Sequence, residues 1–169
     1  MKLLRSATEA EVEAAFVRAE LDSPRFREDV LAGRRGWRIG GLFTGLPEDI
    51  AWERVALEQD ELFAIQYINW HWWLTVSGGT RSPVDAASRI QAGLVPDVTA
   101  ERERPIAARL ATDDPPPELI VVRAGPEAPL VVVEGHGRLT AYALYPEFLP
   151  PALEVFLGTS ARMAEWVQY

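Results

Sequence analysis

The stretch that decides the fold is Leu130-Val131-Val132-Val133-Glu134-Gly135-His136-Gly137-Arg138-Leu139-Thr140-Ala141. Its opening residues are apolar and β-branched, which is typical of a buried strand. Gly135 and Gly137 interrupt this run, and Leu139 to Leu144 then predicts a helix that Pro146 ends. The order strand, glycine-rich turn and helix predicts an α/β fold with a small mixed sheet, and the turn lies at one end of that sheet.

The turn from Glu134 to Arg138 is also the candidate functional site. The free N–H groups and the dipole of a helix N-terminus favour a bound anion, and Gly135 and Gly137 permit close backbone approach or positive φ. Arg138 offers a donor fork that suits phosphate or carboxylate. His136 suits proton transfer near neutral pH, and Glu134 suits a divalent cation or a hydroxyl group. The alternative is an ordinary turn with solvated His136 and Arg138.

The sequence around this turn predicts further strands. Leu119–Arg123 is a second β-branched run, and Gly125-Pro126 marks a turn between the two runs, so they are expected to pair as a hairpin. Leu153–Leu157 alternates apolar and polar residues and predicts a third strand. The segment from Ala161 to Val167 is expected to be helical.

Residues 1–76 are expected to form a mostly helical N-terminal region of one domain that spans residues 1–169. Thr8 is expected to cap a helix that runs to Val17, with a capping box closed by Glu11. Ser23-Pro24 predicts the start of a second helix, with these side chains inward: Phe26, Val30 and Leu31. Apolar spacings near three and four predict one or two helices within Asp49–Trp73. Ser82-Pro83 predicts a further helix, which ends at Gly93.

Composition narrows the function classes. The chain has 169 residues, a net charge of −8 and no cysteine. Without cysteine there can be no disulfide or thiolate nucleophile, and a cytoplasmic location is expected. The acidic balance argues against nucleic-acid binding, and no apolar run is long enough to span a membrane. Lys2 is the only lysine, which excludes a Walker-type phosphate lysine, and the arginine bias indicates a GC-rich bacterial genome.

Residues 80–158 resemble the ParB/sulfiredoxin superfamily. The segment Val84–Gly93 is similar to the family's helix, and Pro117–Val122 resembles the strand that follows it. Val131–Ala141 resembles the signature turn, and Leu153–Leu157 corresponds to the closing strand. The resemblance implies that residues 77–169 form a ParB/sulfiredoxin-like region behind the helical N-terminal region.

The resemblance carries over to individual residues of the turn. Gly135 matches the family glycine, and Arg138 matches an arginine that contacts phosphate in several members. His136 stands where sulfiredoxins place their catalytic cysteine and ParB proteins a glutamate, and it matches the first histidine of the Asp-Gly-His-His-Arg motif of free-serine kinases. Glu134 matches the aspartate of that motif, whereas Gly137 departs from the second histidine. Sulfiredoxin activity is impossible without cysteine.

Three further groups are candidates. In members of this fold the segment before the matching helix often lines the nucleotide pocket, so Thr80 and Arg81 could face Arg138, although a plain connector explains them equally well. Trp70–Trp73 could stack a base, but core packing or a homodimer interface is the commoner use of such aromatics. Glu20 is an option as a catalytic base, since some kinases of this fold use an N-terminal glutamate.

The leading hypothesis is a nucleotide- or phosphate-binding protein. In its enzymatic form it is a phosphotransferase or nucleotide hydrolase that uses Mg²⁺ and a nucleoside triphosphate. His136, Glu134 and Glu20 would then be catalytic. Phosphate would be held by Gly135, Gly137, Arg138, Thr80 and Arg81, and Glu134 would bind metal. The alternative is a non-catalytic module that binds a partner protein or a small anionic ligand.

Overall fold

The computed structural model of the chain describes residues 1–95, 98–112 and 118–169, and for residues 101 and 102 it describes the backbone alone. The strands are β1 (Lys2–Ala7), β2 (Ala51–Glu58), β3 (Leu119–Arg123), β4 (Val131–Glu134) and β5 (Ala152–Thr159). The α-helices are α1 (Glu9–Asp22), α2 (Arg27–Leu31), α3 (Gln59–Phe63), α4 (His71–Ser77), α5 (Pro83–Gln91), α6 (Ala100–Thr112) and α7 (His136–Leu144). Short 3₁₀ helices are η1 (Gly41–Phe43), η2 (Pro146–Phe148) and η3 (Ala161–Glu165).

Within the described ranges the strands form a five-stranded sheet in the order β1-β2-β5-β3-β4. β3 and β5 are parallel, and every other neighbouring pair is antiparallel. The predicted mixed sheet and α/β class are therefore confirmed. The β3–β4 hairpin and the third strand, β5, are confirmed as well.

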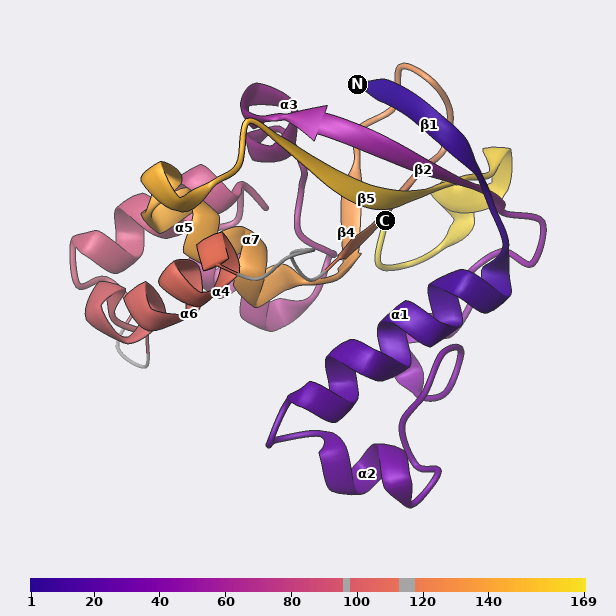
Figure 1. The fold of residues 1–169 in the computed structure, drawn as a ribbon, viewed down its shortest axis with the longest axis horizontal. Helices are drawn as coiled ribbons and strands as arrows, with labels where there is room; N and C mark the ends of the chain where they lie inside the picture. The colour runs from indigo at the N-terminus through magenta and orange to yellow at the C-terminus, as the bar shows by residue number, and fades with distance from the viewer. Residues whose placement is uncertain (96–97, 113–117) are drawn as a thin grey trace.

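The two faces of the sheet carry separate apolar cores. On one face, strand residues such as Val55, Val121 and Val132 pack with Ile90 of α5 and Leu139 of α7. On the other face the buried cluster joins α1 to the sheet and to the C-terminal segment, and it includes Val12, Phe16, Trp52, Ile120, Val133, Phe156, Met163 and Trp166. Figure 1 shows α4 to α7 gathered on one side of the molecule, while α1 and α2 extend from the sheet as a separate arm.

The capping box of the first helix is confirmed. The Thr8 side chain accepts from the Glu11 backbone, and the Glu11 carboxylate accepts from the Thr8 backbone N–H. The helix continues past Val17 to Asp22, because Glu20 falls on the same buried face as Phe16, one turn later. The helix at Ser82-Pro83 is also confirmed, with the Ser82 hydroxyl accepting from the Asp85 backbone.

The prediction of one or two helices within Asp49–Trp73 was wrong for the first part of that segment. Residues 51–58 are strand β2, which pairs with β1 on one side and β5 on the other. Trp52, Val55 and Leu57 are the buried residues of this strand. The apolar residues that follow in the sequence belong to α3, to a loop and to α4. The spacings near three and four arose from adding these short elements together.

The second predicted helix start was also wrong. Ser23 is the C-cap of α1, and α2 begins only at Arg27, with Phe26 in the N-cap position. None of the α2 residues is buried, and Leu31 is 73% exposed.

The C-terminal segment from Ala161 is a 3₁₀ helix that ends at Glu165, and it forms no longer helix. Among the described residues, no helix combines the length and apolar character needed to cross a bilayer.

Candidate functional site: the start of α7 and the charge quartet

The predicted strand–turn–helix is present. β4 ends at Glu134, Gly135 takes the left-handed conformation with φ of +100°, and α7 begins at His136. Gly135 needs to be glycine, because a Cβ there would overlap the side chain of Leu119 and come within 3.0 Å of Arg138 Nη2. The turn is therefore packed tightly against the start of β3.

Among the side chains that the structure describes, none caps the first turn of α7. No side-chain hydrogen bond caps Gly135, and the first helical backbone bond runs from the N–H of Leu139 to Gly135 O, at 2.9 Å. The N–H groups of the preceding helical residues have no partner inside a helix. Gly137 is exposed, and a Cβ built on it would meet nothing within 4 Å. As far as the described part of the chain shows, the helix N-terminus is therefore open beside Gly137.

Arg138 folds back onto the strand ends. Its Nη2 donates to the main-chain oxygen of Glu118 at 2.9 Å and to Glu134 Oε1 at 3.2 Å. Its Nε is enclosed and has no hydrogen-bond partner among the described residues. The side chain is 15% exposed, so the guanidinium is held in place with part of its donor capacity unused.

Glu134 is a largely buried carboxyl group, 18% exposed, between charges of both signs. Burial is the largest effect and raises its pKa above the ordinary value, and the charge of Glu20 acts in the same direction. The guanidinium groups of Arg138 and Arg35 and the Gly135 N–H oppose this rise in pKa. We call Glu20, Arg35, Glu134 and Arg138 the charge quartet.

Half of the charge quartet comes from the N-terminal arm. Glu20, in α1, is 3% exposed and binds Arg35 through both carboxylate oxygens, with Arg35 Nη2 at 3.0 Å from Oε1. The Arg35 guanidinium also lies over the Phe26 ring, 3.9 Å from its centroid. Sequence reasoning named Glu20 and missed Arg35. Glu20 lies one helical turn after Phe16 on the buried face, and a carboxylate there needs a nearby cation.

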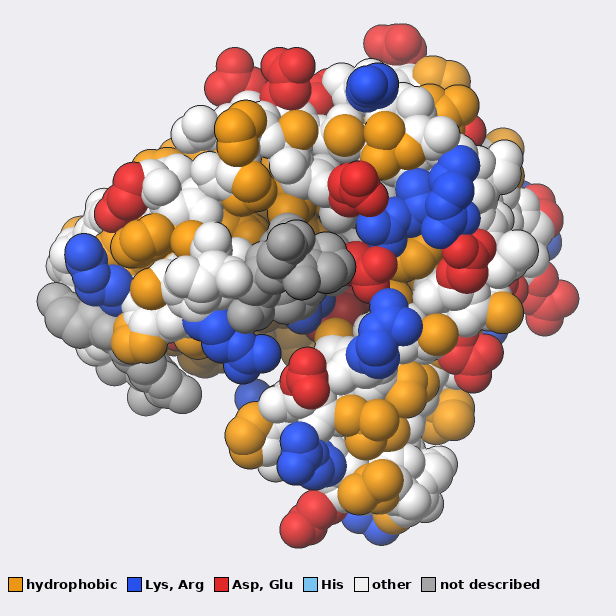
Figure 2. Space-filling model, in the orientation of Figure 1, with side chains coloured by type: hydrophobic (Ala, Val, Ile, Leu, Met, Phe, Trp, Pro, Cys, Tyr) orange, Lys and Arg blue, Asp and Glu red, His pale blue; other side chains and the backbone are white. Residues whose placement is uncertain are grey.

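Glu118 links α1, β2 and the first turn of α7. Its carboxylate binds Arg18 of α1, at 2.9 Å, and Arg54 of β2, while its main-chain oxygen accepts from Arg138. Figure 2 shows a hollow between the arm and the helical side of the molecule, with acidic and basic side chains gathered along it. Sequence reasoning missed Glu118 and Arg54, because no local pattern reports pairing between distant elements.

His136 lies partly buried in an aromatic stack. Its ring centroid lies 4.9 Å from that of Trp73 and 6.1 Å from that of Tyr67, and its Nε2 is buried without a partner among the described residues. Burial, and then the charge of Arg138, lowers the pKa of His136 to about 3. The imidazole is therefore neutral near pH 7, and its place in the stack favours a packing role over proton transfer.

Thr80 and Arg81 serve the local backbone. Thr80 Oγ1 donates to Ser77 O at 3.1 Å, and Arg81 donates from Nε to Tyr67 O at 2.7 Å and from Nη1 to Tyr169 O at 2.9 Å. Arg81 holds a positive φ of 63°. None of these hydrogen bonds reaches Arg138.

The tryptophan-rich segment divides between core and surface. Trp73 stacks on Tyr67 with centroids 4.7 Å apart, whereas Trp70 is 48% exposed and Trp72 is 37% exposed. Core packing holds for Trp73, which packs against both apolar cores, whereas Trp70 is the N-cap of α4 and lies exposed, and the homodimer interface stays a prediction.

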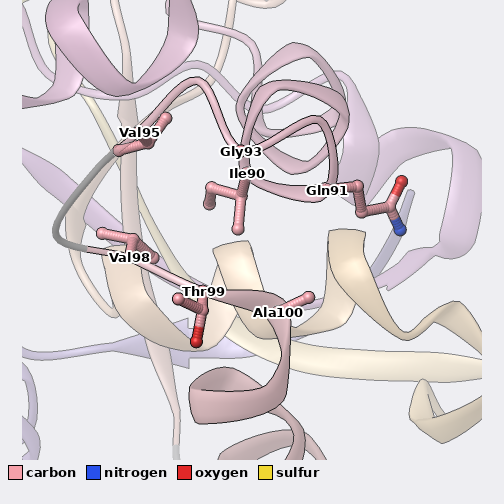
Figure 3. A pocket seen from close by; sticks show the side chains of 7 residues that line it. All are labelled: Ile90, Gln91, Gly93, Val95, Val98, Thr99 and Ala100. Carbon is pink, nitrogen blue, oxygen red and sulfur yellow. The ribbon is translucent and has the colours of Figure 1, made fainter.

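Beyond the turn, the described residues could bind a ligand through a metal-binding cluster or in a cavity. They hold no group of three or more His, Asp or Glu side chains that could bind a metal ion. A cavity of about 300 Å³ lies between the end of α5 and the start of α6, and Figure 3 shows the mainly apolar residues that line it, among them Ile90, Val95 and Val98. None of the predicted site residues lines this cavity.

Comparison with protein-family models, with curated proteins and with solved structures found no match to this chain.

Proposed function

We propose that the chain binds a small phosphate-bearing molecule, with a nucleotide as the expected class, at the start of α7. The observation that carries this proposal is the uncapped helix N-terminus that opens at Gly137 beside Arg138. Its free N–H groups and the helix dipole suit an anion, and the guanidinium adds a fixed positive charge. The order α5, α6, β3, β4, α7 and β5 contains the expected elements of the ParB/sulfiredoxin resemblance with α6 as an additional helix, and it supports that resemblance as part of the same proposal.

If the site also catalyses phosphoryl transfer, its proton acceptor is a carboxylate. His136 is neutral and stacked, so it is poorly suited to the task, whereas Glu134 has a raised pKa at the strand end. Because the described residues form no metal cluster, Mg²⁺ would be carried by the phosphates of the nucleotide. Turnover with Mg²⁺ separates an enzyme from a non-catalytic binding module.

The test is isothermal titration calorimetry and thermal shift with orthophosphate, pyrophosphate and nucleotides, with and without Mg²⁺. At about 100 times the dissociation constant a ligand stabilises the protein by roughly 2.7 kcal/mol, which is several degrees for a chain of this size. Gly137→Asp places a carboxylate at the open helix end, where it complements the dipole and repels the anion without disturbing packing.

Binding should weaken strongly in Gly137→Asp and in Arg138→Gln, and it should persist in Arg162→Gln, a control on η3 whose side chain is 60% exposed. Circular dichroism checks that each variant is folded. Equal binding by wild type and Gly137→Asp, or no binding of any phosphate compound by folded wild type, would overturn the proposal.

The exposed tryptophans support a second candidate function, self-association. Trp70 lies beside the C-terminal segment, because Asn69 donates from its backbone to Gln168 O at 2.8 Å, and Val167 in that segment is 65% exposed. Large exposed apolar groups of this kind are characteristic of protein contacts. Analytical ultracentrifugation should then show a dimer that Trp70→Ser dissociates, and a monomer at all concentrations would contradict it.

A further inference from the structure

Arg35 is fixed in one orientation before any ligand arrives. Glu20, which is 3% exposed, accepts from Nε and Nη2 of the guanidinium, and the Phe26 ring lies under its plane. An arginine held on two sides loses little conformational freedom when it binds a further group. Glu20 and Phe26 therefore act as positioning residues for Arg35.

The Nη1 group of Arg35 is available for a hydrogen bond to a ligand. Its side chain is 32% exposed, and among the described residues no hydrogen bond uses Nη1. In a surface ion pair both partners are solvated. Here the Glu20 carboxylate is buried, whereas the Arg35 guanidinium is partly exposed to solvent. The arm thus presents a positive group outward while its counter-charge stays inside.

Arg35 lies near the start of α7 as well as in the arm. Arg18 of α1, two residues before Glu20, binds the Glu118 carboxylate at 2.9 Å, and the Glu118 main-chain oxygen accepts from Arg138, so α1 and the start of α7 meet at Glu118. The charges of Arg35 and Glu134 also act on each other. Arg138 contacts Glu134 directly from the other side. Two guanidinium groups from distant parts of the chain therefore act on the carboxyl group at the end of β4, Arg138 by direct contact and Arg35 through its charge.

We propose that Arg35 binds a second anionic group of the ligand, so that the ligand class is a small molecule with two neighbouring anionic groups, for which diphosphate is the simplest example. The inference rests on the proposed function: the first anionic group occupies the start of α7 beside Arg138, and the second contacts Nη1 of Arg35. Charge-assisted hydrogen bonds of guanidinium to phosphate are strong enough to make this second contact decisive.

The test compares inorganic orthophosphate with inorganic pyrophosphate by calorimetry. The variant is the paired substitution Glu20→Gln with Arg35→Gln, which removes the cation without leaving a buried carboxylate unpaired. The control is Arg25→Gln, since Arg25 lies over the same Phe26 ring, 5.0 Å from its centroid, and is exposed. Thermal melts establish that each variant is folded.

Wild type and the Arg25→Gln control should prefer pyrophosphate over orthophosphate. The paired variant should lose about tenfold of that preference, the loss expected for one charge-assisted hydrogen bond, while orthophosphate binding stays the same. If the preference is unchanged in the paired variant, or if wild type binds both anions equally, the inference is overturned and the proposed function stands. If wild type binds neither anion, the inference is overturned, and the titrations with nucleotides decide the proposed function separately.

Discussion

The imidazole of His136 lies nearly parallel to the indole of Trp73, with ring centroids 4.9 Å apart and an interplanar angle of 13°. Trp73 comes from α4, and His136 is the first residue of α7. The stack therefore fixes the start of α7 against the helical side of the molecule. A histidine in this position adds to the rigidity of the candidate site, which is the property that an anion-binding helix end requires.

His136 makes the stability of the fold sensitive to acid. Its folded-state pKa of about 3 lies below its ordinary value of 6.5, so the unfolded chain binds the proton more readily. The free energy of unfolding should be highest above pH 6.5 and should fall by up to about 1.4 kcal/mol per pH unit as the pH drops toward 3. Urea denaturation of wild type and His136→Phe, which keeps the stack, measures this slope, and identical slopes would contradict it.

Glu134 should show the opposite dependence. Its folded-state pKa is raised from 4.5, so its stabilising contribution is present below that value and is lost as the pH rises through the folded-state pKa. Glu134→Gln should therefore be more stable than wild type at neutral pH and equal to it in acid, as measured by urea denaturation. Glu165→Gln, at a side chain 65% exposed, is the control. A variant less stable than wild type at neutral pH would show that the ion pair with Arg138 outweighs burial.

The two glycines of the turn should respond differently to alanine. Gly135→Ala introduces a Cβ at positive φ and against Leu119, and we expect a loss of about 2–4 kcal/mol in unfolding free energy. Gly137→Ala meets no atom within 4 Å in the first turn of α7 and should stabilise by about 0.5–1 kcal/mol. Thermal and urea denaturation measure both changes, and equal effects would argue against the packing described for the turn.

The buried bond between Tyr67 and Thr140 should couple the stack to α7. The two hydroxyl oxygens lie 2.7 Å apart, and Thr140 in turn donates to His136 O at 2.8 Å, so Tyr67 is the donor to Thr140. A double-mutant cycle with Tyr67→Phe and Thr140→Val should give a coupling energy of about 1 kcal/mol in unfolding free energy. Additive single effects would mean that the bond contributes nothing to the fold.

The sequence alone determined the elements whose signals are local. The β-branched runs fixed β3 and β4, the Gly135 turn fixed the start of α7, and the Thr8 capping box fixed the start of α1. Each of these signals depends on residues within a few positions of one another, where backbone sterics and hydrogen bonding act directly. The candidate turn was found for the same reason.

Only the tertiary structure decided β2, the charge quartet and the surroundings of His136. Strand β2 is held by β1 and β5, and β5 is about a hundred residues further along the chain, so its own spacing could be mistaken for a helix. Arg35 pairs with a buried Glu20 and its charge acts on Glu134, and His136 is stacked by a tryptophan from α4. Burial and charge pairing between distant segments depend on the folded chain as a whole, and they set the protonation and freedom of the site residues.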